Sequence, residues 1–164
     1  MGTGRIDGVR APGELMRVGI IGLGYRLGYL AHVFNLMVKD FEVAGYVDPA
    51  PAGRAYAQER GVDLGKAYDT PEALLEAEDI DLLMVGSPNH MHLDHIKTGL
   101  AYGRKIFAEK PVVTTIEETI ELAELIGRHP ADQIMVGLVL RYAPLYVDLR
   151  RAQAEGLLGD IVSI

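Results

Sequence analysis

The sequence predicts an α/β protein built on a doubly wound parallel sheet, and three observations support this. Short apolar runs alternate with stretches of helical periodicity, which is typical of βαβ units. Each run is apolar at consecutive positions, as strands covered on both faces of a parallel sheet require. A chain of 164 residues is long enough for one domain with its own core. Six strands with helices between them match the order 3-2-1-4-5-6.

The strands are expected where the apolar runs lie. In the first run, Val18, Ile20 and Ile21 make both faces apolar. The six predicted strands are 17–22, 41–47, 66–68, 80–85, 105–108 and 133–139. A last apolar segment, 160–164, indicates the start of one more strand.

The helices between these strands are predicted from spacing and from end signals. Thr70 and Pro71 form a cap and a first-turn proline, whereas Gly61 and Gly103 end the helices predicted at 52–60 and 90–102. Thr115 and Glu118 form a capping box, and a last helix is expected at 144–155.

Two helices have apolar residues at the spacing of one helical face. For the helix after the first strand these residues are Leu30, Val33, Phe34 and Met37. For the helix after the capping box they are Ile116, Ile120, Ala123 and Ile126. We expect both faces to point inward.

The chain divides into three parts. Residues 1–15 are expected to be a flexible leader, since they lack the apolar region of a secretory signal, and Met16 would serve as a natural start. Residues 16–143 are the predicted domain, and 144–164 are a linking helix and the beginning of a further domain. A chain that stops while entering a strand is expected to be cut short. An exposed apolar strand end would also favour homo-oligomers.

Composition excludes several classes of protein. A net charge of −7 removes the basic footprint of a nucleic-acid-binding domain. The sequence has no cysteine, which excludes disulfides and thiolate zinc sites and fits a cytoplasmic location. No apolar run approaches the roughly 20 residues needed to cross a membrane.

A glycine-rich turn joins the first strand to the first helix. It reads Gly22, Leu23, Gly24, Tyr25, Arg26, Leu27, Gly28. Gly22 permits a tight turn, and Gly24 lets the backbone approach a pyrophosphate at a helix N-terminus. The third glycine falls one residue late, with Leu27 in its expected place. Either the helix packs farther from the strand or the turn carries an extra residue.

Asp48 ends the second predicted strand, where a carboxylate can accept both ribose hydroxyls of an adenosine. This carboxylate would repel a 2′-phosphate, so NAD is favoured. NADP is the alternative cofactor, because Arg26 or Arg54 could reach a 2′-phosphate.

Three segments resemble the glucose–fructose oxidoreductase and inositol dehydrogenase family (Gfo/Idh/MocA). The first is VGIIGLGYRLG together with Asp48. The second is GSPNHMHLDHIKTGLAYGRKIFAEKP, at 86–111, and the third is GLVLRYAPLYVDLRRAQAEGLLGDIVSI, at 137–164. The resemblance covers Met16 through Ile164.

The resemblance implies roles for the Glu109-Lys110-Pro111 signature. Lys110 would lie beside the nicotinamide and the substrate hydroxyl, orient the substrate and help move the hydroxyl proton. A lysine that acts as an acid or base needs a lowered pKa, through burial or cationic neighbours. Glu109 would position the cofactor or its loop, and Pro111 would stiffen the turn.

The resemblance also implies that the loop after the fourth strand lines the cofactor. Ser87, Pro88 and Asn89 would lie between ribose and nicotinamide, His92 would face the same crevice, and Arg141 would contact the nicotinamide end. His90 and His95 are expected at the surface or in caps. His92 and His95 are close to a metal-ligand spacing, but no third ligand is evident and no metal is expected.

Two functions from different classes follow. The first is the cofactor-binding half of an NAD(P)-dependent oxidoreductase acting on a sugar, a polyol or a related hydroxyl compound. This half alone would turn over substrate poorly, because the family's second domain supplies most substrate contacts. The second is a short, non-catalytic NAD-binding sensor or partner module.

Overall fold

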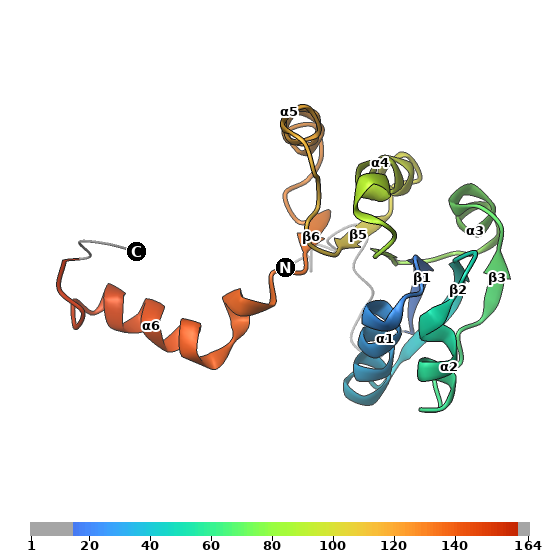
Figure 1. Cartoon of the computed structure of the whole chain (residues 1–164), viewed down its shortest axis with the longest axis horizontal. Helices are drawn as coiled ribbons and strands as arrows, with labels where there is room; N and C mark the ends of the chain where they lie inside the picture. The colour runs from blue at the N-terminus through green and yellow to red at the C-terminus, as the bar shows by residue number, and fades with distance from the viewer. Residues whose placement is uncertain (1–14, 161–164) are drawn as a thin grey trace, which may run out of the picture.

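The protein is described by a computed structural model, which covers residues 15–160. Its centre is a six-stranded parallel sheet with the order β3-β2-β1-β4-β5-β6, as predicted (Figure 1). The strands are β1 Met16–Ile21, β2 Phe41–Val47, β3 Lys66–Tyr68, β4 Leu82–Val85, β5 Lys105–Ala108 and β6 Ile134–Val136.

Helices cover both faces of the sheet (Figure 1). The α-helices are α1 Tyr25–Met37, α2 Ala52–Gln58, α3 Pro71–Ala77, α4 His92–Ala101, α5 Ile116–Ile126 and α6 Pro144–Ala154. Two 3-10 helices, η1 Asn89–Met91 and η2 Val139–Tyr142, precede α4 and α6. The Thr70 cap and the Thr115–Glu118 capping box are both confirmed.

The core has two layers because successive side chains of a strand point to opposite faces. Ile20 packs in the cluster that contains Leu27 of α1, whereas Ile21 packs in the cluster that contains Ile96 of α4. Both isoleucines are almost fully buried. The central strands therefore have helices on both sides, and their carboxyl ends form one edge of the sheet.

The inward face of α1 agrees with the predicted one only in part. Leu30 and Phe34 pack against the core as expected, but Leu27 and Ala31 are the fully buried residues and Met37 is 79% exposed. The reason is a close approach between α1 and α2 at two glycines, where a Cβ on Gly28 would lie 2.7 Å from the carbonyl oxygen of Gly53. This contact brings the face that carries Gly28 and Ala31 against the rest of the domain.

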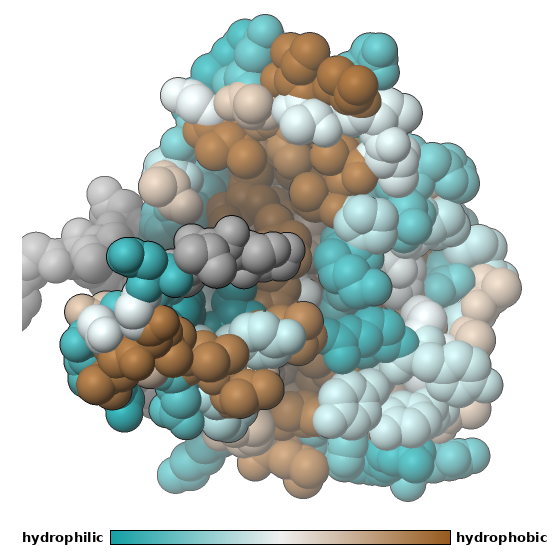
Figure 2. All heavy atoms as spheres, turned by 60° about the vertical axis from the view of Figure 1, so that its left-hand side comes forward, coloured by the Kyte–Doolittle hydropathy of each residue, from teal (hydrophilic) through white to brown (hydrophobic). Residues whose placement is uncertain are grey.

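The expectation for α5 was wrong. Ile116, Ile120 and Ile126 are 76%, 57% and 42% exposed, and the helix is held instead by buried Leu122 and half-buried Leu125. A salt bridge of 2.9 Å also joins Lys97 of α4 to Glu121 of this helix. Among the described residues, no element covers the isoleucine face, which lies at the top of Figure 2.

The chain leaves the sheet earlier than predicted. Strand β6 has three residues, and η2 then turns the chain into α6, which extends away from the sheet (Figure 1). Helix α6 has no buried residue. The predicted leader at 1–15 lies, apart from Leu15, outside the described residues, as does the predicted strand at 160–164, apart from Asp160.

Candidate functional site

The glycine turn after β1 is built so that only glycine fits its first position. Gly22 has a positive φ of 83°, and a Cβ there would lie 2.3 Å from the backbone nitrogen of Ser87. Its own N–H donates to the carbonyl of Val47 at 2.8 Å. Gly22 therefore lies in close contact with the ends of β2 and β4, where a larger side chain would not fit.

Gly24 differs because it faces open space. Apart from Gly24 itself and its two neighbours in the chain, no atom of the described residues lies within 4 Å of the position that a Cβ would occupy. Gly24 is the N-cap of α1, and no side chain caps this helix end. The first N–H groups of α1 and the positive end of its dipole therefore face the same opening, which fits a phosphate group.

The third glycine of the turn, Gly28, falls one residue later than the motif expects, and two contacts explain how the structure accommodates this shift. Helix α1 starts at Tyr25, directly after Gly24, so the turn has no extra residue. Leu27 is accommodated because Gly86 has no side chain: a Cβ on Gly86 would lie 2.6 Å from Leu27 Cγ. Gly28 instead allows α1 to approach α2 closely at Gly53.

Asp48 follows β2 at the same edge of the sheet. Ile21 of β1 pairs with Val47 of β2, which brings Asp48 beside Gly22. The Asp48 side chain is half-buried, and its Oδ1 accepts a hydrogen bond of 2.7 Å from the N–H of Ala50. This bond holds the carboxylate at the carboxyl end of the strand.

A cavity of about 530 Å³ lies at the carboxyl ends of β4, β5 and β6. Six of the predicted site residues line it: Arg26, Ser87, Asn89, His92, Glu109 and Lys110. Sequence reasoning missed three further lining residues, Gly86, Gly137 and Val139. A Cβ on Gly137 would lie 3.3 Å from Glu109 Oε1, and an isolated glycine near a strand end is a signal of such a close approach.

An ion pair crosses this cavity. Arg26 of α1 donates through Nε to Glu109 Oε1 at 2.7 Å, and Glu109 is only 6% exposed. Glu109 Oε2 accepts the backbone N–H of Lys110 at 3.3 Å. The side chain of Lys110 is exposed at the cavity, and the peptide bond that joins it to Pro111 is cis.

Two histidines of α4 hold the loop after β4. The ring nitrogens of His92 lie 2.7 Å from the carbonyl oxygen of Ser87 and 2.9 Å from that of Pro111. His95 Nδ1 lies 2.8 Å from Ser87 Oγ, and either atom can donate. His95 is thus half-buried and hydrogen-bonded, not at the surface as expected. Its pKa is lowered, mainly by burial and to a smaller extent by the nearby His92.

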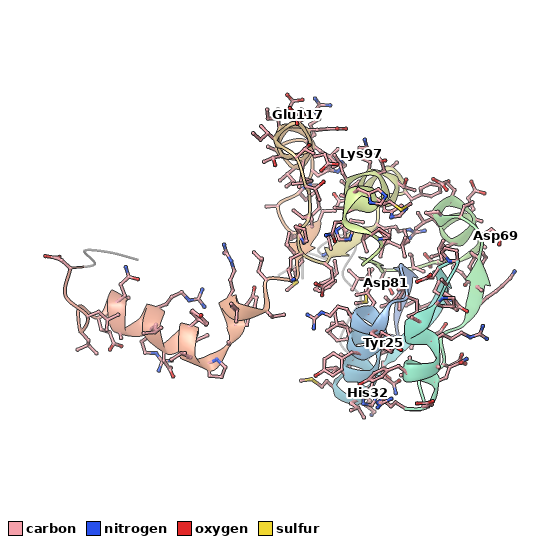
Figure 3. The ribbon with its side chains drawn as sticks, in the orientation of Figure 1. Tyr25, His32, Asp69, Asp81, Lys97 and Glu117 are labelled. Atoms are coloured by element: carbon pink, nitrogen blue, oxygen red, sulfur yellow. The ribbon has the colours of Figure 1, made fainter. Side chains whose placement is uncertain are left out.

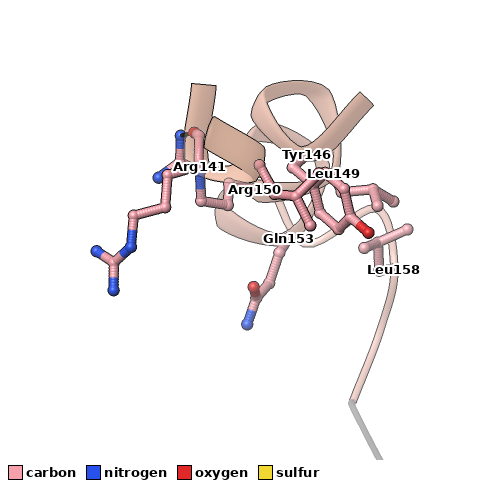
Figure 4. A pocket seen from close by; sticks show the side chains of 7 residues that line it. Arg141, Tyr146, Leu149, Arg150, Gln153 and Leu158 are labelled. Carbon is pink, nitrogen blue, oxygen red and sulfur yellow. Dashed lines mark hydrogen bonds between the residues drawn. The ribbon is translucent and has the colours of Figure 1, made fainter. Parts of the chain in front are cut away.

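Several predicted residues do not line the cavity. Leu23 is fully buried, and Pro88 precedes η1. Arg141 is exposed in η2 and lines a separate hollow beside α6 (Figure 4). Tyr25 is 68% exposed at the start of α1 (Figure 3).

Within residues 15–160, no group of three or more potential metal ligands gathers. None of the helices in this part of the chain is both long and apolar enough to span a bilayer.

The glycine turn, the uncapped helix end and Asp48 together define a dinucleotide-binding domain at the carboxyl edge of a doubly wound sheet. Comparison with known proteins agrees. Residues 16–138 match the model of GFO_IDH_MocA, described as the oxidoreductase family with an NAD-binding Rossmann fold. The chain belongs to this family.

Individual relatives are similar over most of this chain. The rhizopine catabolism protein MocA of Rhizobium meliloti is 30% identical over 146 residues, covering 88% of this chain and 44% of the relative. The scyllo-inositol 2-dehydrogenase (NAD(+)) of Bacillus subtilis (strain 168) is 32% identical over 146 residues, covering 88% of this chain and 42% of the relative. The chain thus spans less than half the length of these relatives.

A solved structure shows the same arrangement. The scyllo-inositol dehydrogenase from Lactobacillus casei, crystallised with NAD(H) and scyllo-inositol, superposes with a TM-score of 0.77 at 26% identity. The match covers 90% of this chain and 43% of that structure.

Proposed function

We propose that this chain is the cofactor-binding part of an NAD-dependent oxidoreductase that acts on a hydroxyl group of a polyol or sugar. The observation that carries the proposal is the open space at Gly24, which lies beside an uncapped helix end and follows a strand that ends next to the strand before Asp48. The family supports the reaction class, and several relatives that are inositol dehydrogenases support an inositol-like substrate.

Residues on two sides of the turn would hold the cofactor. The backbone from Gly22 to Gly24 and the first turn of α1 would bind the pyrophosphate, and Asp48 would accept hydrogen bonds from the adenosine ribose. Ser87, Asn89 and Glu109 line the cavity on the other side, where the nicotinamide end would lie. When bound, NAD supplies the hydride acceptor.

Lys110 is the proposed catalytic residue. Its exposed side chain lies at the cavity next to Glu109, where an ammonium can orient a substrate hydroxyl and take part in moving its proton. The Arg26–Glu109 pair would hold the preceding residue in place. Among the described residues nothing covers Lys110, so we expect the 164-residue chain to oxidise a polyol slowly, because positioning supplies much of the rate.

NAD rather than NADP is favoured by the directions of two side chains. Asp48 offers negative charge where a 2′-phosphate would sit. Arg26, the cation within the turn, is engaged with Glu109 towards β5, on the opposite side of β1 from Asp48. Arg54, the other cation considered for a 2′-phosphate, is exposed in α2.

The test is calorimetric titration of the chain with NAD and NADP. Gly24→Ala would place a methyl group in the open space, so we expect NAD to bind at least about tenfold more weakly. Because alanine is a poorer N-cap than glycine, the unfolding free energy should also fall, by about 1 kcal/mol or less. Asp48→Ala should weaken NAD binding by about tenfold and reduce the preference for NAD over NADP.

Gly127→Ala is the matched control, because Gly127 ends α5 in a helical conformation with ordinary space for a Cβ. This variant should bind NAD like the parent chain. If Gly24→Ala binds NAD as tightly as the parent chain, or if the parent binds neither dinucleotide, the proposal is wrong. NAD binding without any reduction by inositol, even in the protein's native full-length form, would favour the non-catalytic module.

A further inference from the structure

A buried histidine lies between two loops that line the cavity. His92, in the first turn of α4, is 1% exposed. Its Nε2 lies 2.7 Å from the carbonyl oxygen of Ser87, and its Nδ1 lies 2.9 Å from the carbonyl oxygen of Pro111. Carbonyl oxygens only accept hydrogen bonds, so each bond needs an N–H on the ring. Both bonds exist together only when both ring nitrogens carry a proton.

The two loops are otherwise joined through the strands that precede them. Val85 of β4 pairs with Ala108 of β5, and the N–H of Glu109 donates to the carbonyl of Val85 at 2.8 Å. The pairing of β4 with β5 ends at Val85 and Ala108, before Ser87 in one chain segment and before Lys110 and Pro111 in the other. The ring of His92 spans the two chains beyond that point.

We propose that His92 is a positioning residue that holds the Ser87 loop and the Lys110–Pro111 loop at a fixed separation for the cofactor. Both ring nitrogens already face backbone carbonyls, so His92 acts through the loops and not by a polar contact with a ligand. The part of this inference that concerns the cofactor rests on the proposed function.

His95 provides the comparison within the same helix. Its ring contacts Ser87 Oγ and thus the first loop. Removing the His95 ring nitrogens should therefore loosen one loop, whereas removing those of His92 should loosen two.

The experiment compares His92→Phe, His92→Gln and His95→Phe in the 164-residue chain. Phenylalanine keeps a planar ring without N–H groups, and glutamine keeps an N–H donor. Hydrogen–deuterium exchange is followed in segments 86–91 and 109–114, and NAD affinity is measured by calorimetry. We expect His92→Phe to exchange faster in both segments and to bind NAD about tenfold more weakly. His92→Gln should recover only part of this loss, because its single amide nitrogen can donate to one of the two carbonyls. His95→Phe should affect segment 86–91 alone.

A folded His92→Phe chain with parental exchange in both segments would overturn the inference. If the parent chain binds no NAD, the proposed function fails, and the exchange data still decide the role of His92. If His92→Phe does not fold, His92→Ala is tested with added imidazole. Imidazole should restore slow exchange in both segments, whereas 1-methylimidazole, with one nitrogen blocked, should not. Equal effects of the two compounds would contradict the inference.

Discussion

At the scale of single residues, the site depends on pairs in which one side chain occupies the space that another residue leaves. Leu27 stands where a third glycine was expected, and Gly86 across from it has no side chain. The two residues belong to α1 and to the end of β4, 59 positions apart in the chain (86 − 27). A glycine in one segment thus compensates for a leucine in another.

This complementarity predicts strong coupling between the two positions. Gly86→Ala places a methyl group 2.6 Å from Leu27 Cγ and should cost about 1–3 kcal/mol of unfolding free energy. Leu27→Ala leaves a cavity and should cost about 2–5 kcal/mol. In the double variant the alanine at 86 enters the space that Leu27 leaves. The loss of unfolding free energy in the double variant should therefore be at least about 1 kcal/mol smaller than the sum of the losses in the two single variants. Urea unfolding of the four chains measures this, and additive costs would contradict the packing.

His95 predicts a dependence of stability on pH. Burial and the charge of His92 lower its pKa, whereas Asp94 and Glu72 oppose the shift. Between the lowered folded pKa and the ordinary value of about 6.5, the unfolded chain binds more protons than the folded chain. The contribution of neutral His95 is therefore complete above about pH 6.5 and is lost as pH falls through the folded pKa.

The measurement is urea unfolding of the parent chain and of His95→Gln at pH 5.5 and 7.5. The parent should lose more stability on acidification than the variant, because glutamine does not titrate. A comparison at pH 7.5 and 8.5 serves as the control, since both chains should change equally there. Equal losses at pH 5.5 would contradict the assignment to His95.

At the scale of elements, α5 shows what sequence periodicity leaves open. Its isoleucines have the spacing of one face, yet that face is exposed and Leu122 is buried. Periodicity defines a stripe, but the surrounding elements decide which stripe packs inward. Helix α5 lies near the β6 edge of the sheet, where Leu122 and Leu125 reach the core cluster.

The two faces of α5 should therefore respond differently to truncation. Leu122→Ala removes a buried side chain and should cost about 2–3 kcal/mol of unfolding free energy. Ile120→Ala, on the exposed face of the same helix, should change it by no more than about 0.5 kcal/mol. Urea unfolding compares the two. A larger cost at Ile120 would mean that the isoleucine face is covered in solution.

At the scale of the whole molecule, the sequence was sufficient for the sheet order and for most of the cavity lining. Continuous apolar runs indicate buried parallel strands, and the loops that follow parallel strands all lie at the carboxyl ends of the sheet. Ser87, Asn89, Glu109 and Lys110 came from resemblance to a family. Contacts between distant segments could not be predicted, such as Arg26 with Glu109 and His95 with Ser87, because nothing local in the chain encodes them.

The same contrast between local and distant contacts predicts where the folding unit ends. Helix α6 has no buried residue, and η2 is the element that it chiefly contacts. Strand β6, by comparison, pairs with β5 from Ile106 with Ile134 to Ala108 with Val136. We therefore expect the boundary proposed from sequence at residue 143 to separate a packed sheet from a helix that adds little to its stability.

A chain ending at Ala143 should keep the unfolding free energy within about 1 kcal/mol of the parent value, because none of the described residues after Ala143 is buried. A chain ending at Ala131 also loses β6, so it should be clearly less stable and expose the apolar edge of β5. Urea unfolding midpoints and NAD titration of both chains test this. Loss of cooperative unfolding in the chain ending at Ala143 would show that α6 packs on the sheet in solution, and the hollow beside Arg141 and Tyr146 would then be part of that contact.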